Sequence, residues 1–414
     1  MKTRTVNQPT KSRQPVSEPL PLSRRSTGGA VIGLLTTIYV LALILGFVIF
    51  RREGATPRGS EMSTFRAVFT AVNTLTLTGF QQTVPLTDYG HAWMAVLMVI
   101  GTLFTLILGG MALVRAAGMR YSDFQIVRAT VGYYALAVFV GAALLAEPDR
   151  GVLASAFQAA SAFGNFGLHI GILPAPTDWR THLVLMPLAF LGGLGVPVLL
   201  DIIGAMLGHH RTTAHTRVVI VMAAVVYVIG LVACVPWDQI NSSRSAATNL
   251  AVGSAMSLNT RTTGFALISI SNLARVTQWL ILCMMIVGAA PGGAAGGVKF
   301  TTLFNLTRGI HRSIRGQAAG HTFAIAAVWA AGYGLLILTV LLILLGIHPE
   351  MPADHLLFVC VSAVGTVGLS QNPITITGGG LIVLSIAMLV GRLAPLLVLW
   401  WCAAEPEPDA VAVG

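Results

Sequence analysis

Eight long apolar runs with almost no charged residues constrain this chain more than any other feature of its sequence. A helix needs about 20 apolar residues to cross the hydrocarbon core of a bilayer. Only 10% of the 414 residues are charged, whereas a soluble domain carries about 25%, so the chain cannot cover a water-facing surface. We therefore predict an all-α integral membrane protein that embeds in lipid, with spans at residues 30–50, 91–114, 129–146, 183–200, 218–235, 276–298, 322–347 and 373–391.

The basic residues lie mainly in the tail at residues 1–26 and in the connectors after every second span. Lys and Arg accumulate on the cytoplasmic side of membrane proteins, so we expect a cytoplasmic tail and a multi-pass protein. Acidic residues are more frequent on the opposite side, which indicates that cations approach there. The net charge of +10 does not indicate a nucleic-acid partner, because a nucleic-acid binder also needs a polar body.

The segments between the spans on the outer side repeat one pattern four times. Each is a short run of helical character that ends in a glycine followed by Phe or Leu, so we expect four fused units of span, short re-entrant helix, glycine loop and span. The repeats are FTAVNTLTLTGF at residues 69–80, FQAASAFGNFGL at 157–168, SAMSLNTRTTGF at 254–265 and CVSAVGTVGL at 360–369.

Such a repeat suits a pore. Non-helical backbone at membrane depth is tolerated only where protein shields it or where it lines a watery cavity. Four loops around a pseudo-fourfold axis would place carbonyl oxygens in one ring, where they can replace the water shell of a cation, as TVGYG loops do in potassium channels. Glycine adopts the backbone angles that this requires, and Thr366, Val367 and Gly368 match the first three letters of TVGYG. The alternative is that each glycine only allows tight packing at a turn.

Motifs in the third and fourth units are the most specific. They are NTRTTGF at residues 259–265, PGGAAGGVK at 291–299, SAVGTVGLS at 362–370 and Gly391-Arg392. With them the chain resembles the Trk/Ktr/HKT superfamily of cation transporters over about residues 27–402. It resembles the KtrB membrane subunit most, because only one span precedes the first loop.

This resemblance implies a homodimer in the bacterial cytoplasmic membrane, with one central pore per subunit. It also implies a cytosolic nucleotide-binding regulatory ring of the KtrA/TrkA type as a separate partner. The nucleotide would then belong to the ring, and the chain itself would hold no organic cofactor.

The resemblance further implies potassium as the transported ion. Four filter glycines accompany potassium preference in this superfamily, whereas a serine at the first position accompanies sodium. A sodium-coupled or sodium-permeable transporter is the alternative. The filter residues that we predict, with potassium held by their backbone carbonyls, are Leu77, Thr78, Gly79, Asn165, Phe166, Gly167, Thr262, Thr263, Gly264, Thr366, Val367 and Gly368.

Residues 288–297, which we name the glycine–alanine segment, interrupt the sixth span with Pro291 and clustered glycines that break helices. A phosphate-binding P-loop is excluded, because Val298 stands where that pattern requires Lys. The resemblance implies an intramembrane loop that blocks the pore and moves aside on activation, and a passive kink is the alternative. The predicted gate residues are Gly292, Gly293, Gly296, Gly297, Lys299 and Arg392.

Several polar residues near the spans carry separate expectations. Arg392, inside the last span, is predicted to act as a positive barrier in the inner cavity, and Arg261 to brace a short helix by hydrogen bonding. Asp201 either pairs with a basic residue at the cytoplasmic end of its span or is exposed there. His209, His210 and His215 are interpreted as part of a solvated basic connector, with a metal site as the alternative.

Two other functional classes fit the sequence less well than a gated pore. A secondary active transporter would show discontinuous spans in corresponding halves, whereas only the sixth span is predicted to be broken. An enzyme would need a polar cluster within the spans, which the sequence lacks. We therefore predict potassium uptake through a gated pore and no enzymatic activity. The predicted parts are a cytoplasmic tail at 1–26, pore units at 27–118, 119–210, 211–316 (with the gating loop) and 317–402, and a C-terminal tail at 403–414.

Overall fold

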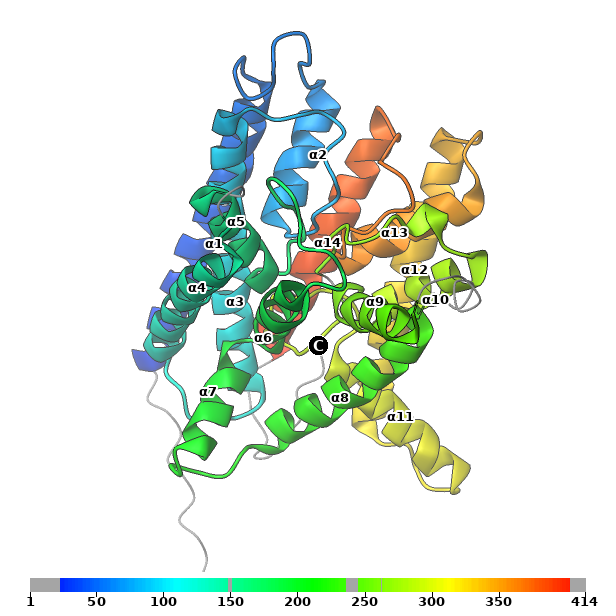
Figure 1. Cartoon of the computed structure of the whole chain (residues 1–414). Coiled ribbons are helices and arrows are strands. Elements are labelled where there is room, and N and C mark those ends of the chain that lie inside the picture. Colours follow the sequence, from blue (N-terminus) through cyan, green and yellow to red (C-terminus); the bar gives the residue numbers. More distant parts are fainter. Residues whose placement is uncertain (1–22, 148–150, 236–244, 262, 403–414) are drawn as a thin grey trace, which may run out of the picture.

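In the computed structural model of the chain, all regular secondary structure in the described part is helical (Figure 1). The described residues are 23–147, 151–235, 245–261 and 263–402. No β-strand occurs among them, which confirms the all-α prediction. Most of the predicted tail at 1–26, all of the tail at 403–414 and the predicted filter residue Thr262 lie outside them.

Within these residues, six helices are long and apolar enough to cross a membrane, and each overlaps a predicted span. Polar N-caps define where several of them begin. The Ser122 side chain, for example, accepts a hydrogen bond from the Gln125 N–H in a reciprocal capping box at the start of α4. The last helix begins six residues later than predicted and continues past Arg392, so the predicted range 373–391 is wrong at both ends. The six are α1 (Ser23–Arg51), α3 (Asp88–Ala116), α4 (Asp123–Leu145), α8 (Ala214–Cys234), α12 (His321–Ile347) and α14 (Gly379–Cys402).

The fourth predicted span, residues 183–200, is not one helix. A π-helical turn, η1 (Thr181–Leu185), leads into α6 (Met186–Leu194), and α7 (Val196–Met206) then leaves at an angle of 99°. Gly195 makes this bend in a left-handed conformation, with φ of 80°, which costs glycine little. Pro197 lies in the first turn of α7, where a missing N–H does no harm.

The sixth predicted span is also discontinuous. The helix α10 (Arg275–Ile286) ends before the glycine–alanine segment, the backbone from 287 to 299 is non-helical, and α11 (Phe300–Ile314) follows. The interruption was predicted, but the residues after it were interpreted as a connector rather than a helix. The expectation that only the sixth span is broken is wrong, because Gly195 breaks the fourth.

Four short helices stand where the repeat predicts them. Most of their residues are buried, and each is followed by non-helical backbone that contains the glycine of its repeat. Ser63 and Ser245 cap the first and third through their side-chain oxygens. The short helices are α2 (Thr64–Leu75), α5 (Val152–Phe163), α9 (Ala246–Asn259) and α13 (Ala353–Gly365).

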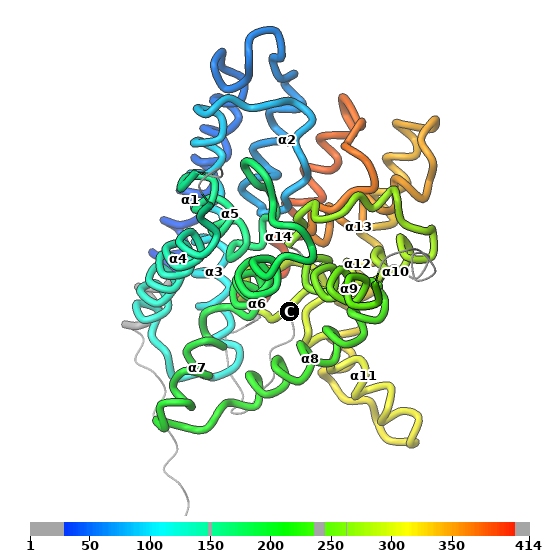
Figure 2. The backbone as a smooth tube through the Cα atoms, viewed as in Figure 1, coloured from blue at the N-terminus to red at the C-terminus, as the bar shows by residue number. Residues whose placement is uncertain are grey.

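The elements group into four consecutive sets that contact one another in a cycle (Figure 2). The sets are α1–α3, α4–α7, α8–α11 and α12–α14. The first set contacts the second through α3 and α4, and the second contacts the third through α6 and α9. The third contacts the fourth through α10 and α13, and α14 of the fourth returns to α2 and α3. The chain thus closes on itself around a common centre.

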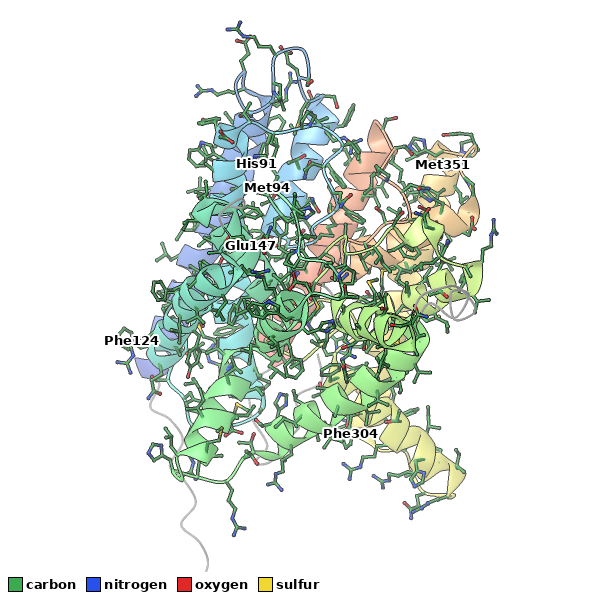
Figure 3. The ribbon with its side chains drawn as sticks, viewed as in Figure 1. His91, Met94, Phe124, Glu147, Phe304 and Met351 are labelled. Carbon is green, nitrogen blue, oxygen red and sulfur yellow. The ribbon has the colours of Figure 1, made fainter. Side chains whose placement is uncertain are left out.

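Apolar side chains cover much of the outer surface of the helices. Phe124 and Phe139 on α4, and Val328 on α12, are more than two-thirds exposed, and Phe124 lies at the edge of the molecule (Figure 3). Exposed apolar surface of this extent is expected where lipid is the solvent. At the opposite end from the tip of α2, α11 projects away from the body (Figure 1).

Candidate functional site

The four glycine loops touch one another in cyclic order. We define them as the non-helical residues that end at Gly79, Gly167, Gly264 and Gly368. A Cβ added to any one of these glycines would collide with a backbone carbonyl oxygen of a neighbouring loop. The oxygens, in the order of the glycines above, are those of Phe166, Thr263, Val367 and Thr78. The first loop therefore meets the second, the second the third, the third the fourth, and the fourth the first.

The backbone of these loops has an unusual conformation. All four glycines have φ between 70° and 85°, and Leu77, Asn165 and Thr366, each two residues before a glycine, also have φ near 50°. They are the three non-glycine residues with positive φ in the described part of the chain. Such angles are uncommon for residues with a side chain and concentrate at functional sites.

Two buried asparagines hold the first and third loops closed. In the first loop, the Asn73 amide Nδ2 donates to the Phe80 carbonyl oxygen and its Oδ1 accepts from the Phe80 N–H, both at 2.9 Å. Asn259 makes the same two bonds to Phe265, at 2.7 and 2.8 Å. Each asparagine satisfies two backbone groups that would otherwise be buried without partners.

The second and fourth loops have serines instead. Ser161 and Ser362 are fully buried, and their hydroxyl oxygens have no hydrogen-bond partner. Their backbone carbonyls accept from the N–H of Phe166 and Val367, five residues on. Side-chain support by asparagine therefore occurs in alternate loops, the first and the third.

The third loop is one residue shorter than the others. In the other three loops, the residue before the glycine donates its N–H to the carbonyl oxygen of the residue five positions earlier. The accepting carbonyls are those of Asn73, Ser161 and Ser362. In the third, Gly264 itself makes this bond, to the Asn259 carbonyl. The repeat is therefore not exactly fourfold, and an alignment on the glycines alone misplaces Asn259 by one position.

The Asn165 side chain joins the second loop to two other parts of the site. Its Nδ2 donates to the Ala189 carbonyl of α6 at 3.0 Å, and the Thr263 hydroxyl of the third loop donates to its Oδ1 at 3.4 Å. Asn165 is 2% exposed. Its amide therefore links neighbouring loops in addition to its predicted role through the backbone carbonyl.

The glycine–alanine segment packs directly against helices of three units. Its N–H groups at Ala290 and Ala294 donate to the carbonyls of Gly193 and Gly192 on α6. A Cβ on Gly292 would meet the backbone of Gly109 on α3, and one on Gly296 the backbone at the end of α13. The glycines therefore allow backbone-to-backbone contact that side chains would prevent.

Arg392 ties this segment to the first glycine loop. Its guanidinium donates from Nε to the Thr76 carbonyl at 2.7 Å, from Nη2 to the Leu77 carbonyl at 3.4 Å, and from Nη1 to the Ala294 carbonyl. Lys299 donates to the Ala295 carbonyl at 2.5 Å, and both cations are more than nine-tenths buried.

The predicted gate residues come together around one small cavity. Five of the six predicted gate residues line this cavity. The sixth, Gly292, precedes the lining residue Gly293 in the sequence. The predicted gate residues in the lining are Gly293, Gly296, Gly297, Lys299 and Arg392.

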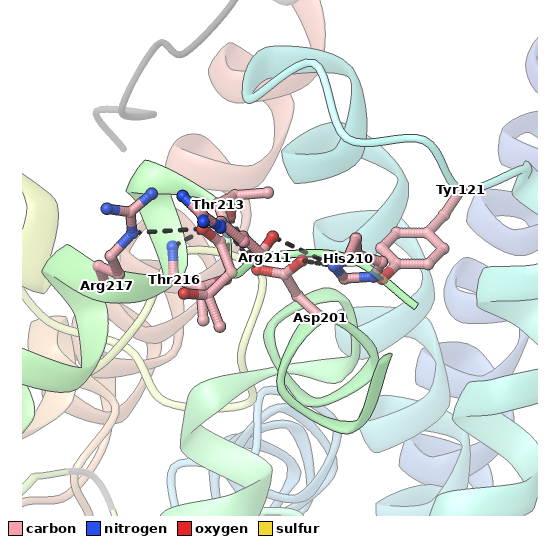
Figure 4. Close-up of polar contacts among 8 residues, drawn as sticks. Tyr121, Asp201, His210, Arg211, Thr213, Thr216 and Arg217 are labelled. Atoms are coloured by element: carbon pink, nitrogen blue, oxygen red, sulfur yellow. Dashed lines mark hydrogen bonds and ion pairs between the residues drawn. The ribbon is translucent and has the colours of Figure 1, made fainter. Parts of the chain in front are cut away.

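Asp201 lies within α7, and its almost fully buried side chain contacts residues of the turn between α7 and α8 (Figure 4). It accepts two hydrogen bonds from Thr213, the N-cap of α8, each at 2.9 Å, and lies 3.7 Å from the His210 imidazole. Burial and the nearby Asp201 carboxylate raise the pKa of the Tyr121 phenol to about 12. The partner of Asp201 is thus a helix cap and a histidine, rather than an arginine or lysine.

The structure also bears on the expectations for His215 and Arg261. His215 is 1% exposed on α8, so the interpretation of a wholly solvated histidine connector is wrong for that residue. Arg261 donates to the Ser257 hydroxyl of α9 at 3.2 Å, as expected of a residue that braces this helix.

Two features of the site were not predicted from the sequence. They are the asparagine clamps, which are the paired bonds of Asn73 to Phe80 and of Asn259 to Phe265, and the Asn165 link, which is the bond between the Thr263 hydroxyl and Asn165. A usable signal existed for the clamps, because Asn73 and Asn259 each stand in an apolar helix six or seven residues before the Phe of a Gly-Phe pair. The Asn165 link joins residues 98 positions apart, and no local pattern reveals it.

Comparisons with known proteins agree with this architecture. The family model described as TrkH, cation transport protein, matches residues 218–408. The Ktr system potassium uptake protein D of Bacillus subtilis is 24% identical over 89% of this chain and 92% of its own length. The potassium/sodium uptake protein NtpJ of Enterococcus hirae is 28% identical, over 61% of this chain and 60% of its own.

A solved structure shares the fold. The crystal structure of the potassium transporter TrkH from Vibrio parahaemolyticus superposes with a TM-score of 0.68 at 16% identity, and the match covers 87% of this chain and 84% of that one. These relatives are transporters and not enzymes, in agreement with the prediction. The resemblance inferred from the motifs is thereby confirmed, and the chain is a membrane protein similar to the Trk/Ktr potassium transporters.

Proposed function

We propose that this protein takes up potassium selectively across the bacterial cytoplasmic membrane, through a gated pore whose filter is made of the four glycine loops. The observation that carries the proposal is the cyclic contact of the four loops, each through a carbonyl oxygen of the residue before a glycine. A single chain thereby supplies four carbonyl groups around one centre, which suits a dehydrated monovalent cation.

The short helices favour the same ion. α2, α5, α9 and α13 all end at the glycine loops, so their C-termini, which carry about half a negative charge each, converge on the proposed filter. Negative potential at this point attracts cations and repels anions. In the first, second and fourth loops a left-handed residue stands two positions before the left-handed glycine, and strained backbone of this kind concentrates at functional sites.

The glycine–alanine segment is the proposed gate, with Arg392 as its latch. Arg392 bonds both to the first glycine loop and to the segment, so movement of the segment would break these bonds. Its positive charge next to the filter would repel a passing cation while the gate is closed. Activation is then the release of this contact.

A homodimer and a cytosolic nucleotide-binding ring are the proposed partners. Support comes from the relatives, whose names describe them as parts of a Ktr system. The ring would meet the cytoplasmic end, where α11 projects from the body and carries Arg308 and Arg312 (Figure 1).

A sodium-permeable or sodium-coupled transporter is the second candidate. The name of the relative NtpJ includes sodium, and two spans are discontinuous rather than one, which weakens the earlier argument against coupled transport. The presence of glycine at all four loop positions favours potassium.

Uptake by a potassium-auxotrophic host tests the filter. Gly79 has φ of 82°, and a side chain there would displace the Phe166 carbonyl of the next loop. We expect Gly79→Ser to lower potassium uptake at least about tenfold, a barrier increase of about 1.4 kcal/mol, and to lower the potassium-to-sodium ratio. Gly132→Ser is the control, because nothing lies within 4 Å of a Cβ at that helical glycine. Unchanged potassium and sodium uptake in well-expressed Gly79→Ser would refute the filter.

A further inference from the structure

A second internal cavity lies behind the second and third glycine loops. It shares no lining residue with the gate cavity and is bounded by Asn165 and Thr263 of the loops, by Ala289 of the glycine–alanine segment, and by α6 and α11. It has room for about one small ion or one to two water molecules. Most of its wall is apolar. The residues that line it are Asn165, Ala189, Phe190, Gly193, Leu194, Leu258, Arg261, Thr263, Ala289 and Phe300.

Arg261 is the one charged residue among those that line this cavity. It is 4% exposed, and its guanidinium lies 6.0 Å from the ring centre of Phe300, another lining residue. Only Nη2 is hydrogen-bonded, to Ser257, whereas Nε and Nη1 are buried without a partner. Two neighbouring nitrogens of a full positive charge are therefore without a partner in a side chain that helps to line the cavity.

The charge of Arg261 is also not neutralised by protein. Within the described part of the chain it makes no ion pair. The buried cations Arg66, Lys299 and Arg392, by comparison, all bond to backbone carbonyl oxygens. An unpaired buried charge is strongly destabilising, and here it would also repel cations in the adjacent loops.

We infer that this cavity binds one small monovalent anion, of the size of chloride, against Nε and Nη1 of Arg261. A water molecule could fill the space and accept the two hydrogen bonds, but it would leave the charge uncompensated. An anion accepts the two hydrogen bonds and also compensates the charge, and it screens the proposed filter from the guanidinium. The site does not depend on the transported ion, so it stands or falls separately from the proposed function.

Bromide is the probe, because its anomalous scattering distinguishes it from water. In crystals of the wild-type protein grown with bromide, we expect an anomalous peak within hydrogen-bond distance of Nε and Nη1 of Arg261. Density for water alone at this position, with no anomalous signal, would overturn the inference. This measurement needs no variant, so a folding defect cannot obscure it.

Thermal unfolding of the purified protein gives the second test. At fixed potassium and ionic strength, replacement of gluconate by bromide should raise the melting temperature of the wild type saturably, as expected for a ligand that binds the folded state. Arg261→Gln should abolish this dependence, and Arg217→Gln, at an exposed arginine of α8, should retain it. An equal bromide effect in Arg261→Gln and the wild type would contradict the site.

Discussion

Asn73 and Asn259 show how single side chains hold a strained loop in place, since each satisfies both backbone groups of a phenylalanine six or seven residues away. Replacing Asn73 by Ala leaves the buried N–H and C=O of Phe80 unpaired, at about 1–3 kcal/mol each. We expect Asn73→Ala to destabilise the protein by about 2–5 kcal/mol and to lower the potassium-to-sodium uptake ratio. Thermal unfolding and competitive uptake measure the two effects.

The matched control for this prediction is Asn305→Ala. Asn305 is also a buried asparagine, at 4% exposure, but its Nδ2 has no partner. Its replacement should cost less and leave the uptake ratio unchanged. Equal losses in the two variants would show that Asn73 contributes only by filling space.

Arg392 is the residue whose charge should matter most for rate. We expect Arg392→Ala to raise potassium flux about tenfold, which corresponds to a barrier lower by about 1.4 kcal/mol, because a buried positive charge beside the first loop is removed. Flux into proteoliposomes measures this. Arg392→Lys keeps the charge and should stay near the wild-type rate, whereas a slower pore in Arg392→Ala would contradict the barrier role.

Residue types that carry backbone constraints were the most predictable part of the site. The four glycines were identified from the repeat, and all four adopt positive φ and meet a neighbouring loop. Leu77, Asn165 and Thr366 were also in the predicted set, and of these only asparagine is a residue type that often adopts a left-handed backbone. Their conformation follows from the loops around them.

At the level of elements, the bend at Gly195 connects α6 and α7 to the proposed gate. A Cβ there would lie 2.7 Å from the Gly292 oxygen and 2.8 Å from the Gly293 nitrogen. Gly195 combines φ of 80° with ψ of 155°, a region that costs residues with a side chain about 1–3 kcal/mol, and this contact adds to that cost. We expect Gly195→Ala to destabilise the protein by about 2–4 kcal/mol, measured by thermal unfolding.

Gly208→Ala separates the two contributions. Gly208 has nearly the same φ, 75°, but nothing lies within 4 Å of a Cβ at that position. Its replacement should therefore cost only the conformational part, about 1–2 kcal/mol. If Gly195→Ala cost no more than this, α7 would not be packed against the glycine–alanine segment as described.

Element boundaries were predictable where a helix is straight and failed where it breaks. Hydropathy does not distinguish a continuous helix from two helices joined at Gly195, because the apolar run is the same in both. α11 was missed for a different reason. Its sequence is amphipathic and contains Arg308 and Arg312, so it falls below the apolar threshold for a span while it remains helical.

For the molecule as a whole, the distribution of basic residues predicts its orientation in the membrane. We place the loop after α1 outside and the turn after α11 inside. In a background without native cysteines, a membrane-impermeant maleimide added to intact cells should label Arg58→Cys but not Gln317→Cys, both at exposed positions. Permeabilised cells should show both, and the reverse pattern in intact cells would invert the topology.

The cyclic order of the four units could be expected from the sequence, because a repeat that is buried on one side packs best on its neighbours. The departures from symmetry could not. The third loop is one residue shorter, and asparagine alternates with serine at the start of the loops. Both features are recognised only from the hydrogen bonds, because in the third loop Gly264 itself donates the N–H that the residue before the glycine donates in the other loops.

The closure of all four loops within one polypeptide has a genetic consequence. In an assembly of identical subunits, one altered codon changes every wall of the ring at once. Here a codon change at Gly79, Gly167, Gly264 or Gly368 alters one quarter of the ring. In the filter that we propose, ion preference would then change in single steps, and each wall could diverge on its own.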